Sequence, residues 1–418
     1  MEKRKKIVLI GGGFAGLHLA KKLNNENFDV LLIDKQNHHQ FQPLYYQVAC
    51  ARLEPSNISF PFRKIFQKTK NIQIRLAEVK KIVSKESKIE TSIGDYHYDY
   101  LVIATGCKTN FFGNVEMAKH ALSMKTTEEA IDIRNNILLS FEKIISAEKK
   151  DRAALMNIVL VGGGPTGVEL AGAFAEMRNH ILPRDYPHMD FSHLKVILLE
   201  GSKHTLNSMS DEAKKASHKY LKELGVIVKT ETIVTNYDGQ IATLNDGETI
   251  PTSNLIWAAG VTGNIIEGLP NENIIKNRYK VDRYNKVIGT ENIYAIGDIA
   301  YMETPLYPNS HPQLANVAIN QGKNLANNFL NMVKKKPLKE YEYKDLGSMA
   351  TVGKHRAVVD LPFMKFHGFF AWFVWMFLHL MLILSVRNKI IIFFNWAWNY
   401  FTKDSSLRLI LKQKKELI

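Results

Sequence analysis

The first three quarters of the chain alternate between short apolar runs and glycine-rich or polar segments. Two apolar runs, residues 7–10 and 158–161, each lead directly into three glycines and then into apolar positions at helical spacing, 17–23 and 168–177. In both places a second apolar run follows and ends in an acid. Short, continuously apolar runs are typical of parallel strands buried on both faces. The pattern therefore predicts two β-α-β units and an α/β fold.

Further runs extend this pattern. Buried strands are predicted at residues 28–34, 100–106, 194–200, 254–260 and 293–298. Residues 126–150, between the two units, have an amphipathic pattern that predicts a helix. Its apolar positions are Ile131, Ile137, Leu138, Phe141, Ile144 and Ile145. The unit that begins at residue 7 has a near-copy that begins at residue 158, which indicates an internal duplication.

The pattern changes sharply near the C-terminus. Residues 368–386 are almost wholly apolar, residues 387–389 are polar, and residues 390–401 are again apolar and rich in aromatic side chains. At ~1.5 Å per residue the first run is long enough for the ~30 Å hydrocarbon core, so one alternative is a single transmembrane span. The second is a pair of helices lying in the membrane interface, and the third is a hydrophobic dimer interface. Aromatic residues suited to a membrane interface are Trp372, Trp375, Trp396, Trp398 and Tyr400.

Composition narrows the classes of function. The 418 residues carry a formal net charge of +14, which suggests an anionic partner. The basic residues are dispersed and gather best beside the C-terminal apolar runs, so a lipid surface is expected rather than nucleic acid. Only Cys50 and Cys107 occur, without metal-type spacing, so no metal site, iron–sulfur cluster or redox-active disulfide is expected. The run at residues 7–10 is too short for a signal peptide, which predicts a cytoplasmic N-terminus.

The first glycine turn has the spacing of a dinucleotide-binding fingerprint. The motif is Gly11-x-Gly13-x-x-Gly16, with Phe14 and Ala15 before its last glycine. The first glycine makes the tight turn, the second lets the backbone approach a pyrophosphate, and the third permits close helix–strand packing. The helix N-terminus adds a positive dipole end. Asp34 follows at about the separation at which an acid meets a ribose 2′-hydroxyl.

The second turn repeats this spacing. It has Gly162, Gly164 and Gly167, with Pro165 and Thr166 before the last glycine. Its acid, Glu200, comes later because residues 179–193 form an insertion. A carboxylate there repels a 2′-phosphate, so NADH is expected rather than NADPH, although Lys203 and His204 weaken that preference. Two dinucleotide sites in one chain imply that one nucleotide passes electrons to the other, and non-covalent FAD with NADH as substrate is the natural pairing.

The order of these motifs resembles that of flavoproteins with two dinucleotide-binding domains. In that group, strand ends such as those at Thr105–Gly106 and Asp298 approach FAD. The resemblance therefore adds Lys35, Thr105, Gly106 and Asp298 to the expected FAD site. A strand-end aspartate is suited to accept hydrogen bonds from the ribityl hydroxyls of FAD, and a helix N-cap is the alternative role for Asp298.

Within that group the chain resembles type II NADH dehydrogenase, the single-subunit, non-proton-pumping NADH:quinone oxidoreductase. The matching stretches are residues 38–49, 162–176, 257–261, 311–322 and the aromatic block with 395–398. Disulfide reductases and sulfide:quinone reductases rely on cysteines that this chain lacks, and soluble ferredoxin-type reductases lack the C-terminal apolar segment. The resemblance implies hydride transfer from NADH to FAD, then transfer of two electrons to a quinone of a respiratory chain. The alternatives are a reductase with a soluble acceptor and a membrane-bound nucleotide sensor with low turnover.

The resemblance also assigns individual roles. By position alone, Glu169 belongs to the first turn of its helix, where the dipole favours a carboxylate. The resemblance instead implies a catalytic role, in which Glu169 hands a proton to the reduced quinone or flavin. His38 and His39 are expected to lie in a loop that lines the flavin rather than to bind a metal.

The same resemblance extends two substrate sites. It adds Ala259 and Gly260 to the NADH site, and it places a quinone site at Ala315, Asn316, Asn320 and Gln321. Asn316 and Asn320 stand where the family motif has glutamines, which keeps the amide but shortens its reach by a methylene. Quinone affinity and preference are therefore expected to differ.

The predicted architecture has two Rossmann-like dinucleotide-binding domains and a C-terminal amphipathic, membrane-anchoring helical module. Residues 1–122 and 290–345 are assigned to the FAD-binding domain, 123–289 to the inserted NADH-binding domain, and 346–418 to the module for membrane association and quinone access. The resemblance favours peripheral, monotopic attachment to the cytoplasmic face of the inner membrane. A homodimer is compatible with such attachment.

Overall fold

The computed structural model describes residues 4–24, 27–402 and 407–411. The packing of the chain divides it into two compact units. Unit 1 comprises Met1–Gln40, Phe60–Lys108 and Val261–Asp345, and unit 2 comprises Phe41–Ser59, Thr109–Gly260 and Leu346–Ile418. Each unit contains a five-stranded parallel sheet with helices, which confirms the predicted α/β class.

The sheet of unit 1 explains the first set of apolar runs. Its strands lie in the order β22 (Ile293–Ala295), β9 (Tyr100–Ile103), β1 (Lys5–Ile10), β2 (Phe28–Asp34) and β5 (Ile72–Leu76). All neighbours are parallel, and β1 lies in the middle with Ile7 opposite Val30 of β2 and Tyr100 of β9. Ile7, Val8 and Leu9 are completely buried. A central parallel strand is covered on both faces, so its sequence is apolar at every position.

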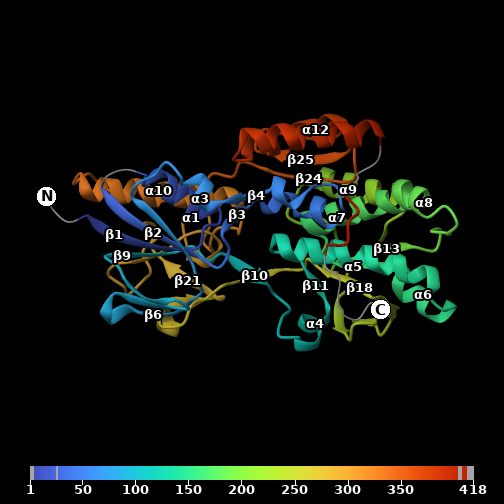
Figure 1. Ribbon diagram of the computed structural model, residues 1–418, viewed down its shortest axis with the longest axis horizontal. Helices are drawn as coiled ribbons and strands as arrows, with labels where there is room; N and C mark the ends of the chain where they lie inside the picture. The colour runs from blue at the N-terminus through green and yellow to red at the C-terminus, as the bar shows by residue number, and fades with distance from the viewer. Residues whose placement is uncertain (1–3, 25–26, 403–406, 412–418) are drawn as a thin grey trace. The chain divides into compact units, whose positions relative to one another are not determined.

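Two helices of unit 1 pack closely against each other. They are α1 (Phe14–Lys22) and α10 (Ala315–Val333), seen side by side in Figure 1. A Cβ atom at Gly322 of α10 would lie 2.3 Å from the carbonyl oxygen of Ala15, so only glycine fits at this crossing. Two small sheets complete unit 1: antiparallel β6 (Val79–Val83), β7 (Lys88–Thr91) and β8 (Gly94–His97), and β20 (Ile274–Ile275), β21 (Arg278–Val281) and β23 (Ala300–Met302).

The sheet of unit 2 repeats the design. Its strands lie in the order β11 (Leu122–Ser123), β18 (Asn254–Trp257), β12 (Asn157–Val161), β13 (Lys195–Leu199) and β14 (Ile227–Lys229), all parallel. The helix α7 (Pro165–Glu176) follows the central strand β12 as α1 follows β1. An antiparallel sheet of β15 (Val234–Tyr237), β16 (Ile241–Leu244) and β17 (Thr249–Pro251) accompanies it. The duplication predicted from the sequence is therefore present in three dimensions.

The predicted amphipathic helix between the two β-α-β units is divided in two. It forms α5 (Thr127–Ser146), which begins with a capping box between Thr126 and Glu129, and α6 (Lys149–Met156). Ile137, Leu138, Phe141 and Ile144 are buried as expected. The placement of Ile145 on the buried face is wrong, because its side chain is 55% exposed. It follows Ile144 directly and so points about 100° away around the helix.

Further helices and strands connect these sheets. The helices are α2 (Tyr45–Ala49), α3 (Phe62–Ile65), α4 (Val115–His120), α8 (Leu182–Asp185) and α9 (Asp211–Glu223). The strands are β3 (His38–Gln40), β4 (Ser59–Pro61), β10 (Cys107–Thr109) and β19 (Val261–Gly263).

The C-terminal part of unit 2 holds the two apolar runs. An antiparallel sheet of β24 (Ser348–Thr351), β25 (Ala357–Leu361) and β26 (Met364–Gly368) leads into α11 (Phe369–Leu382) and α12 (Val386–Thr402). The predicted run 368–386 is thus shared between two helices. Within the described ranges, none of the helices has both the length and the apolarity to cross a membrane.

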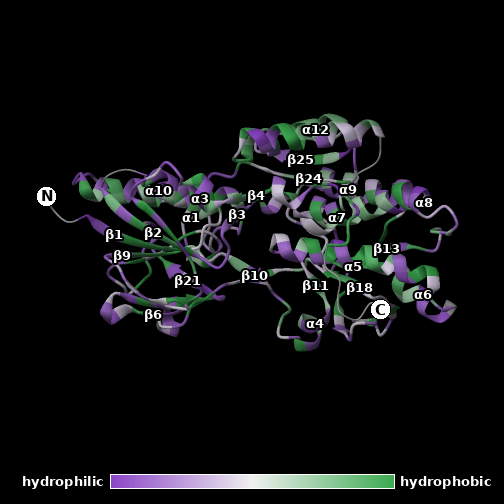
Figure 2. Ribbon diagram, in the orientation of Figure 1, coloured by the Kyte–Doolittle hydropathy of each residue, from purple (hydrophilic) through white to green (hydrophobic). Residues whose placement is uncertain are grey.

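Both C-terminal helices expose large hydrophobic side chains. Figure 2 colours several segments of α12 as hydrophobic. We call these side chains the C-terminal apolar face. Its members, each about half exposed or more, are Phe369, Phe370, Phe373, Phe377, Met381, Leu382, Val386, Ile390, Phe393, Phe394, Trp398 and Phe401. Soluble monomers seldom expose apolar residues so densely, so this face is a candidate for interaction.

The boundaries of the two compact units follow from packing, and they do not show which part of the chain binds which nucleotide. Residues 261–289, placed by the sequence analysis in the NADH-binding domain, pack within unit 1, where β21 pairs with β23. The functional boundaries at residues 122, 289 and 345 stay a prediction.

Candidate active site

The first glycine turn lies between β1 and α1 in unit 1. Gly11 has a φ of +99°, and a Cβ atom there would lie 2.3 Å from the carbonyl oxygen of Ala104. A Cβ at Gly16 would lie 2.0 Å from the carbonyl oxygen of Gly11. Gly13 differs, because no atom lies within 4 Å of the Cβ position. Packing therefore requires glycine at Gly11 and Gly16, whereas Gly13 leaves open space at the N-terminus of α1.

The second turn, between β12 and α7 in unit 2, has the same geometry. Gly162 has a φ of +107°, and its Cβ position lies 2.7 Å from the carbonyl group of Ala258. A Cβ at Gly167 would lie 1.9 Å from the carbonyl oxygen of Gly162, whereas the Cβ position of Gly164 has no neighbour within 4 Å. Each turn thus offers an open backbone surface and a helix N-terminus, which fits the pyrophosphate of a dinucleotide.

The two strand-end acids are bound to the turns themselves. Asp34 accepts hydrogen bonds from the backbone N–H of Gly12 at 2.6 Å and of Gln36 at 2.8 Å, and burial raises the pKa of its carboxyl. Glu200 accepts from the N–H of Gly163 and from the N–H and hydroxyl of Ser202 at 2.7 and 2.6 Å. The sequence analysis missed this role of the middle glycines. Their N–H groups hold the acids beside the turns, where an acid can reach a ribose.

A basic cleft adjoins Glu200. It lies between the loop after β13 and helix α9, and only one acid, Glu223, is among its lining residues. Its cationic or titratable basic residues are Lys203, His204, Lys214, Lys215, His218, Lys219 and Lys222. The loop is fixed to the turn by the bond from the N–H of Leu206 to the carbonyl of Gly163 at 2.7 Å. Positive charge therefore lies near the predicted ribose position.

The other predicted FAD residues converge near the first turn. Asp298 accepts a hydrogen bond from the Cys107 thiol at 3.0 Å, and the Thr105 hydroxyl donates to the carbonyl of Asn264 at 2.8 Å. Gly106 has a φ of +65° in the adjoining turn. The N-cap alternative for Asp298 is wrong, because Asp298 lies inside the 3-10 turn Gly297–Ile299, whose N-cap is Ile296.

The side chains beside the turn are aromatic, small or basic. Phe14 meets the ring of His39 edge-on at 5.1 Å, and Ala15 is buried near Gly297. Nδ1 of His39 lies 3.0 Å from the carbonyl oxygen of Gly12, and burial lowers its pKa to about 4, so this ring is neutral. Lys35 is exposed and pairs with Glu78 at 2.5 Å. No cluster of three potential metal ligands occurs in the part of the chain that the structure describes.

The four predicted quinone residues lie at the start of α10 in unit 1. Ala315, Asn316 and Asn320 are partly exposed, and the two asparagines are one helical turn apart. Gln321 is only 1% exposed, and its amide oxygen accepts a hydrogen bond from the N–H of Gly297 at 2.7 Å. The side chain of Gln321 therefore holds the turn that carries Asp298.

The predicted NADH residues gather at the second turn. Pro165 and Thr166 are exposed at the start of α7, and Ala259 follows β18 with its backbone nitrogen 2.8 Å from the Cβ position of Gly162. Gly260 has a φ of +100°, and its Cβ position lies 3.1 Å from the ring of Phe112.

Glu169 lies further along α7. Because Pro165 already occupies the first helical position, Glu169 is the fifth residue of the helix, and the structure records no acid in the first turn. Its expected place in the first turn is therefore wrong. Its Oε1 atom accepts from the backbone N–H and the hydroxyl of Thr351 at 3.3 and 3.4 Å, and burial raises the pKa of the carboxyl to about 8. A carboxyl that titrates near neutral pH is suited to donate or accept a proton.

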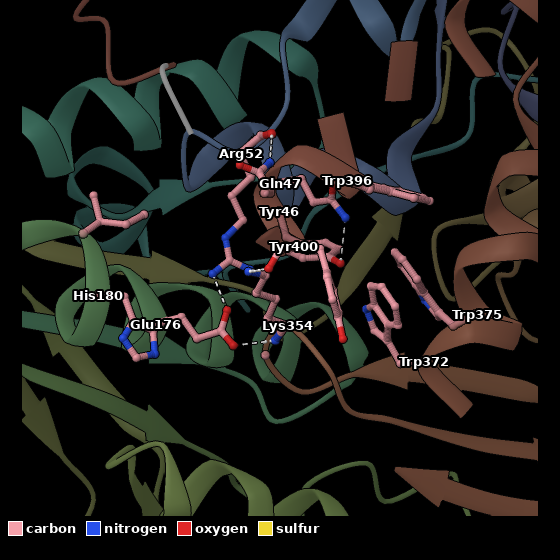
Figure 3. Close-up of a pocket in the computed structure, with 13 residues that line it drawn as sticks. Tyr46, Gln47, Arg52, Glu176, His180, Lys354, Trp372, Trp375, Trp396 and Tyr400 are labelled. Carbon is pink, nitrogen blue, oxygen red and sulfur yellow. Dashed lines mark hydrogen bonds and ion pairs between the residues drawn. The ribbon is translucent and has the colours of Figure 1, made fainter. Parts of the chain in front are cut away.

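A cavity in unit 2 lies beside this region (Figure 3). It encloses about 710 Å³ not filled by atoms, part of it open to solvent, and α11 and α12 form one wall. Trp372, Trp375 and Trp396 line one side. On the other side Arg52 donates to the Glu176 carboxylate at 2.5 Å. The sequence analysis missed Thr351, Arg52 and Glu176, because they have no motif and their partners are distant in the chain.

The chain matches two protein families. Residues 5–322 match the pyridine nucleotide-disulphide oxidoreductase family, and residues 346–403 match the NDH2 C-terminal domain. The type II NADH:quinone oxidoreductase Ndh of Mycobacterium tuberculosis is 32% identical, over 96% of this chain and 89% of that protein. Type II NADH:quinone oxidoreductase NdhA of the same organism is 31% identical, over 98% of this chain and 90% of that protein.

Solved structures agree in fold. NDH2 from Plasmodium falciparum in complex with NADH superposes with a TM-score of 0.89 at 22% identity, covering 98% of this chain and all of that one. The sulfide:quinone oxidoreductase of Aquifex aeolicus gives a TM-score of 0.72 at 18% identity, covering 96% of each chain. Together the two family matches and the relatives above 30% identity settle the family: the chain is a member of the type II NADH:quinone oxidoreductases, within the pyridine nucleotide-disulphide oxidoreductases.

Proposed function

We propose that this protein transfers hydride from NADH to FAD and then two electrons to a quinone, without pumping protons. The observation that carries the proposal is the pair of equivalent turns, each with an open glycine and an acid bound to the middle glycine. Relatives that carry the name NADH:quinone oxidoreductase match nearly the whole chain. The turn of unit 1 would bind FAD, the electron carrier, and the turn of unit 2 would bind NADH, the substrate.

FAD fits the turn of unit 1. Gly11, Gly13, Phe14, Ala15 and Gly16 would hold its pyrophosphate, and Asp34 and Lys35 its adenosine end. Thr105, Gly106 and Asp298 would lie along the ribityl chain. When bound, FAD supplies the two-electron carrier. Buried, neutral His39 supports the Gly12 carbonyl of this turn.

NADH fits the turn of unit 2. Gly162, Gly164, Pro165, Thr166 and Gly167 would bind its pyrophosphate, Glu200 its ribose, and Ala259 with Gly260 the part nearer the nicotinamide. The Glu200 carboxylate favours NADH by repelling a 2′-phosphate, and the basic cleft reduces that preference.

Glu169 is the proposed proton donor to the reduced quinone or flavin. Its support is a carboxyl with a pKa of about 8 whose Oε1 atom is bound to Thr351. We assign quinone binding to Ala315, Asn316 and Asn320, while Gln321 shapes the adjoining turn. Amide groups one helical turn apart are suited to hydrogen-bond a quinone carbonyl.

The C-terminal apolar face is the proposed site of membrane attachment, on the cytoplasmic face of the inner membrane. Its aromatic residues and the neighbouring Arg387 and Lys389 suit an anionic lipid interface. Flotation with anionic liposomes tests this. Phe394→Asp should release the protein, and Leu306→Asp, an equally exposed apolar position in unit 1, should not.

NADH oxidation by detergent-purified, FAD-loaded protein tests the reaction itself. A short-chain quinone should stimulate turnover strongly, and NADPH should replace NADH poorly. If NADH reduces the flavin but the quinone does not reoxidise it, quinone is not the acceptor.

A further inference from the structure

A chain of hydrogen bonds links the C-terminal helix α12 to Glu169 within unit 2. Trp396 donates through Nε1 to Oε1 of Gln47 at 2.7 Å, and Nε2 of Gln47 donates to the Tyr46 hydroxyl at 3.0 Å. The Tyr46 hydroxyl lies 3.1 Å from the Thr351 hydroxyl, which in turn bonds to Glu169. The four side chains that lead to Glu169 are each at least 90% buried: Trp396, Gln47, Tyr46 and Thr351.

The direction of the chain follows from which groups can donate. The indole N–H of Trp396 can only donate, so the Gln47 atom facing it is the amide oxygen, and the amide NH₂ must face Tyr46. The Tyr46 oxygen accepts that bond, and the arrangement that satisfies both buried hydroxyls is the one in which Tyr46 donates to the Thr351 oxygen, 3.1 Å away. The Thr351 hydroxyl then has its proton free for Glu169. In this arrangement every proton in the chain points from α12 toward the carboxylate.

A fixed direction has a consequence at the end of the chain. Glu169 receives hydrogen bonds from both the hydroxyl and the backbone N–H of Thr351, which an ionised carboxylate accepts and a protonated one cannot accept equally well. We propose that Trp396, acting through Gln47 and Tyr46, is a positioning residue that keeps Glu169 the accepting end of this chain, so that the docking of α12 controls when Glu169 takes up a proton. The inference rests on the proposed role of Glu169 in proton transfer.

Other titratable groups lie on the elements that pack against α7. Of the elements packed against α7, β24 and β12 carry no titratable side chain, and α2 carries Tyr45 and Tyr46, whose pKa values burial raises. Arg52 is paired with Glu176 and also approaches the carbonyl of Ala173, one turn beyond Glu169. The remaining charged or titratable groups on packed elements are Lys195 of β13, Arg178 and His180 of the turn after α7, and Asp211, Glu212, Lys214, Lys215, His218, Lys219, Tyr220, Lys222 and Glu223 of α9.

The donor end of the chain borders the cavity under the C-terminal helices. Tyr46, Gln47 and Trp396 all line it, and Trp396 belongs to the helix that also carries the C-terminal apolar face (Figure 3). A movement of α12 would separate Trp396 from Gln47 first. The Gln47 amide could then turn over, so that Tyr46 donates to it and Thr351 donates to Tyr46. Glu169 would in that arrangement have to donate to Thr351, which favours its protonated form.

Infrared titration of the Glu169 carboxyl in the FAD-loaded protein tests the proposal directly. The carboxyl band is assigned by its loss in Glu169→Gln. Trp396→Phe keeps an aromatic ring, although a smaller one, and removes the N–H, and we expect it to raise the pKa of Glu169 by about one unit, the value of one hydrogen bond. Tyr46→Phe, which breaks the chain with little change in volume, should shift the pKa in the same direction. Trp398→Phe is the matched control, since Trp398 lies on the same helix with its side chain 67% exposed, and its titration should equal that of the wild type.

The outcomes separate the inference from the proposed function. An unchanged carboxyl titration in both Trp396→Phe and Tyr46→Phe overturns the inference, whatever the turnover. A shifted carboxyl titration without any shift in the pH profile of quinone reduction supports the chain but overturns the proton-donor role of Glu169. An equal shift in Trp398→Phe would show a general effect of α12 and would also overturn the inference.

Discussion

The two glycine turns have the same backbone but different residues at the same helical position. Two residues after the third glycine, α1 carries His18 and α7 carries Glu169. His18 bonds within its own helix, to the carbonyl oxygen of Phe14 at 2.8 Å, and burial lowers its pKa. Glu169 bonds to a strand that lies far along the sequence, and burial raises its pKa to about 8.

The two copies share the backbone of the turn and differ in the side chain at the helical position beyond it. The first and last glycines of each motif are constrained by contacts closer than a Cβ atom allows, and both copies have them. The helical position beyond the turn is free of that constraint. In unit 2 it faces β24, where a carboxyl acquires a partner, whereas α1 packs chiefly against the helix α10. The comparison leads to four predictions, which pair a change in one copy with the matching change in the other.

Replacing each of the two helical residues by glutamine should give the largest difference between the copies, measured as the rate of flavin reoxidation. Glu169→Gln should slow reoxidation of the reduced flavin by quinone about 100-fold, the usual contribution of a positioned acid or base. His18→Gln should leave that step close to wild type, because His18 bonds only within its helix. Anaerobic stopped-flow separates flavin reduction from reoxidation. Equal rates of reoxidation in the two variants would remove the functional difference between the copies.

Filling the open glycine positions tests which nucleotide each turn binds. Gly13 and Gly164 both have extended backbone angles and no neighbour within 4 Å of their Cβ positions, so valine should not disturb either fold. In the bound state the added side chain costs about 2 kcal/mol, roughly 30-fold in affinity. Gly13→Val should lose FAD during purification, and Gly164→Val should keep FAD but need about 30-fold more NADH. Retention of FAD is read from the flavin absorbance, and loss of FAD in Gly164→Val would reverse the assignment.

The sequence was sufficient for the turns but not for the partner of Glu169. A tight turn and a buried strand are encoded by neighbouring residues, so glycine spacing and apolar runs predicted both β-α-β units. Thr351 lies 182 residues after Glu169, and nothing in a single sequence marks that pair. The break between α11 and α12 was equally hidden, because apolar residues continue through it and hydropathy does not report where a helix ends. The same limit applies to the link from Trp396 to Gln47, which only the fold brings together.

Replacing the strand-end acids Glu200 and Asp34 should give a smaller difference between the copies, measured as the preference for NADPH over NADH. Glu200→Gln keeps an oxygen for the Gly163 N–H but removes the charge, and the basic cleft beside it then favours a 2′-phosphate. The ratio of kcat/KM for NADPH to that for NADH should rise about tenfold, since the charges lie near the surface and are screened. Asp34→Asn should weaken retention of FAD and leave that ratio unchanged. A rise in the ratio in Asp34→Asn would show that the first turn also contacts the nicotinamide nucleotide.

The smallest expected effect is on stability, and it occurs at opposite ends of the pH range in the two copies. The folded state holds the Glu169 proton more tightly than the unfolded chain, so stability is lost as the pH rises from about 4.5 toward about 8. The folded state holds the His18 proton less tightly, so stability is lost as the pH falls below about 6.5. Glu169→Gln should therefore raise the Tm of the FAD-loaded protein by about 2–4 °C at pH 9 relative to pH 5, and His18→Gln should raise it only on the acid side. Thermal unfolding across pH measures both, and a rise in Tm at the same end of the pH range in the two variants would mean that burial does not shift these two pKa values in opposite directions.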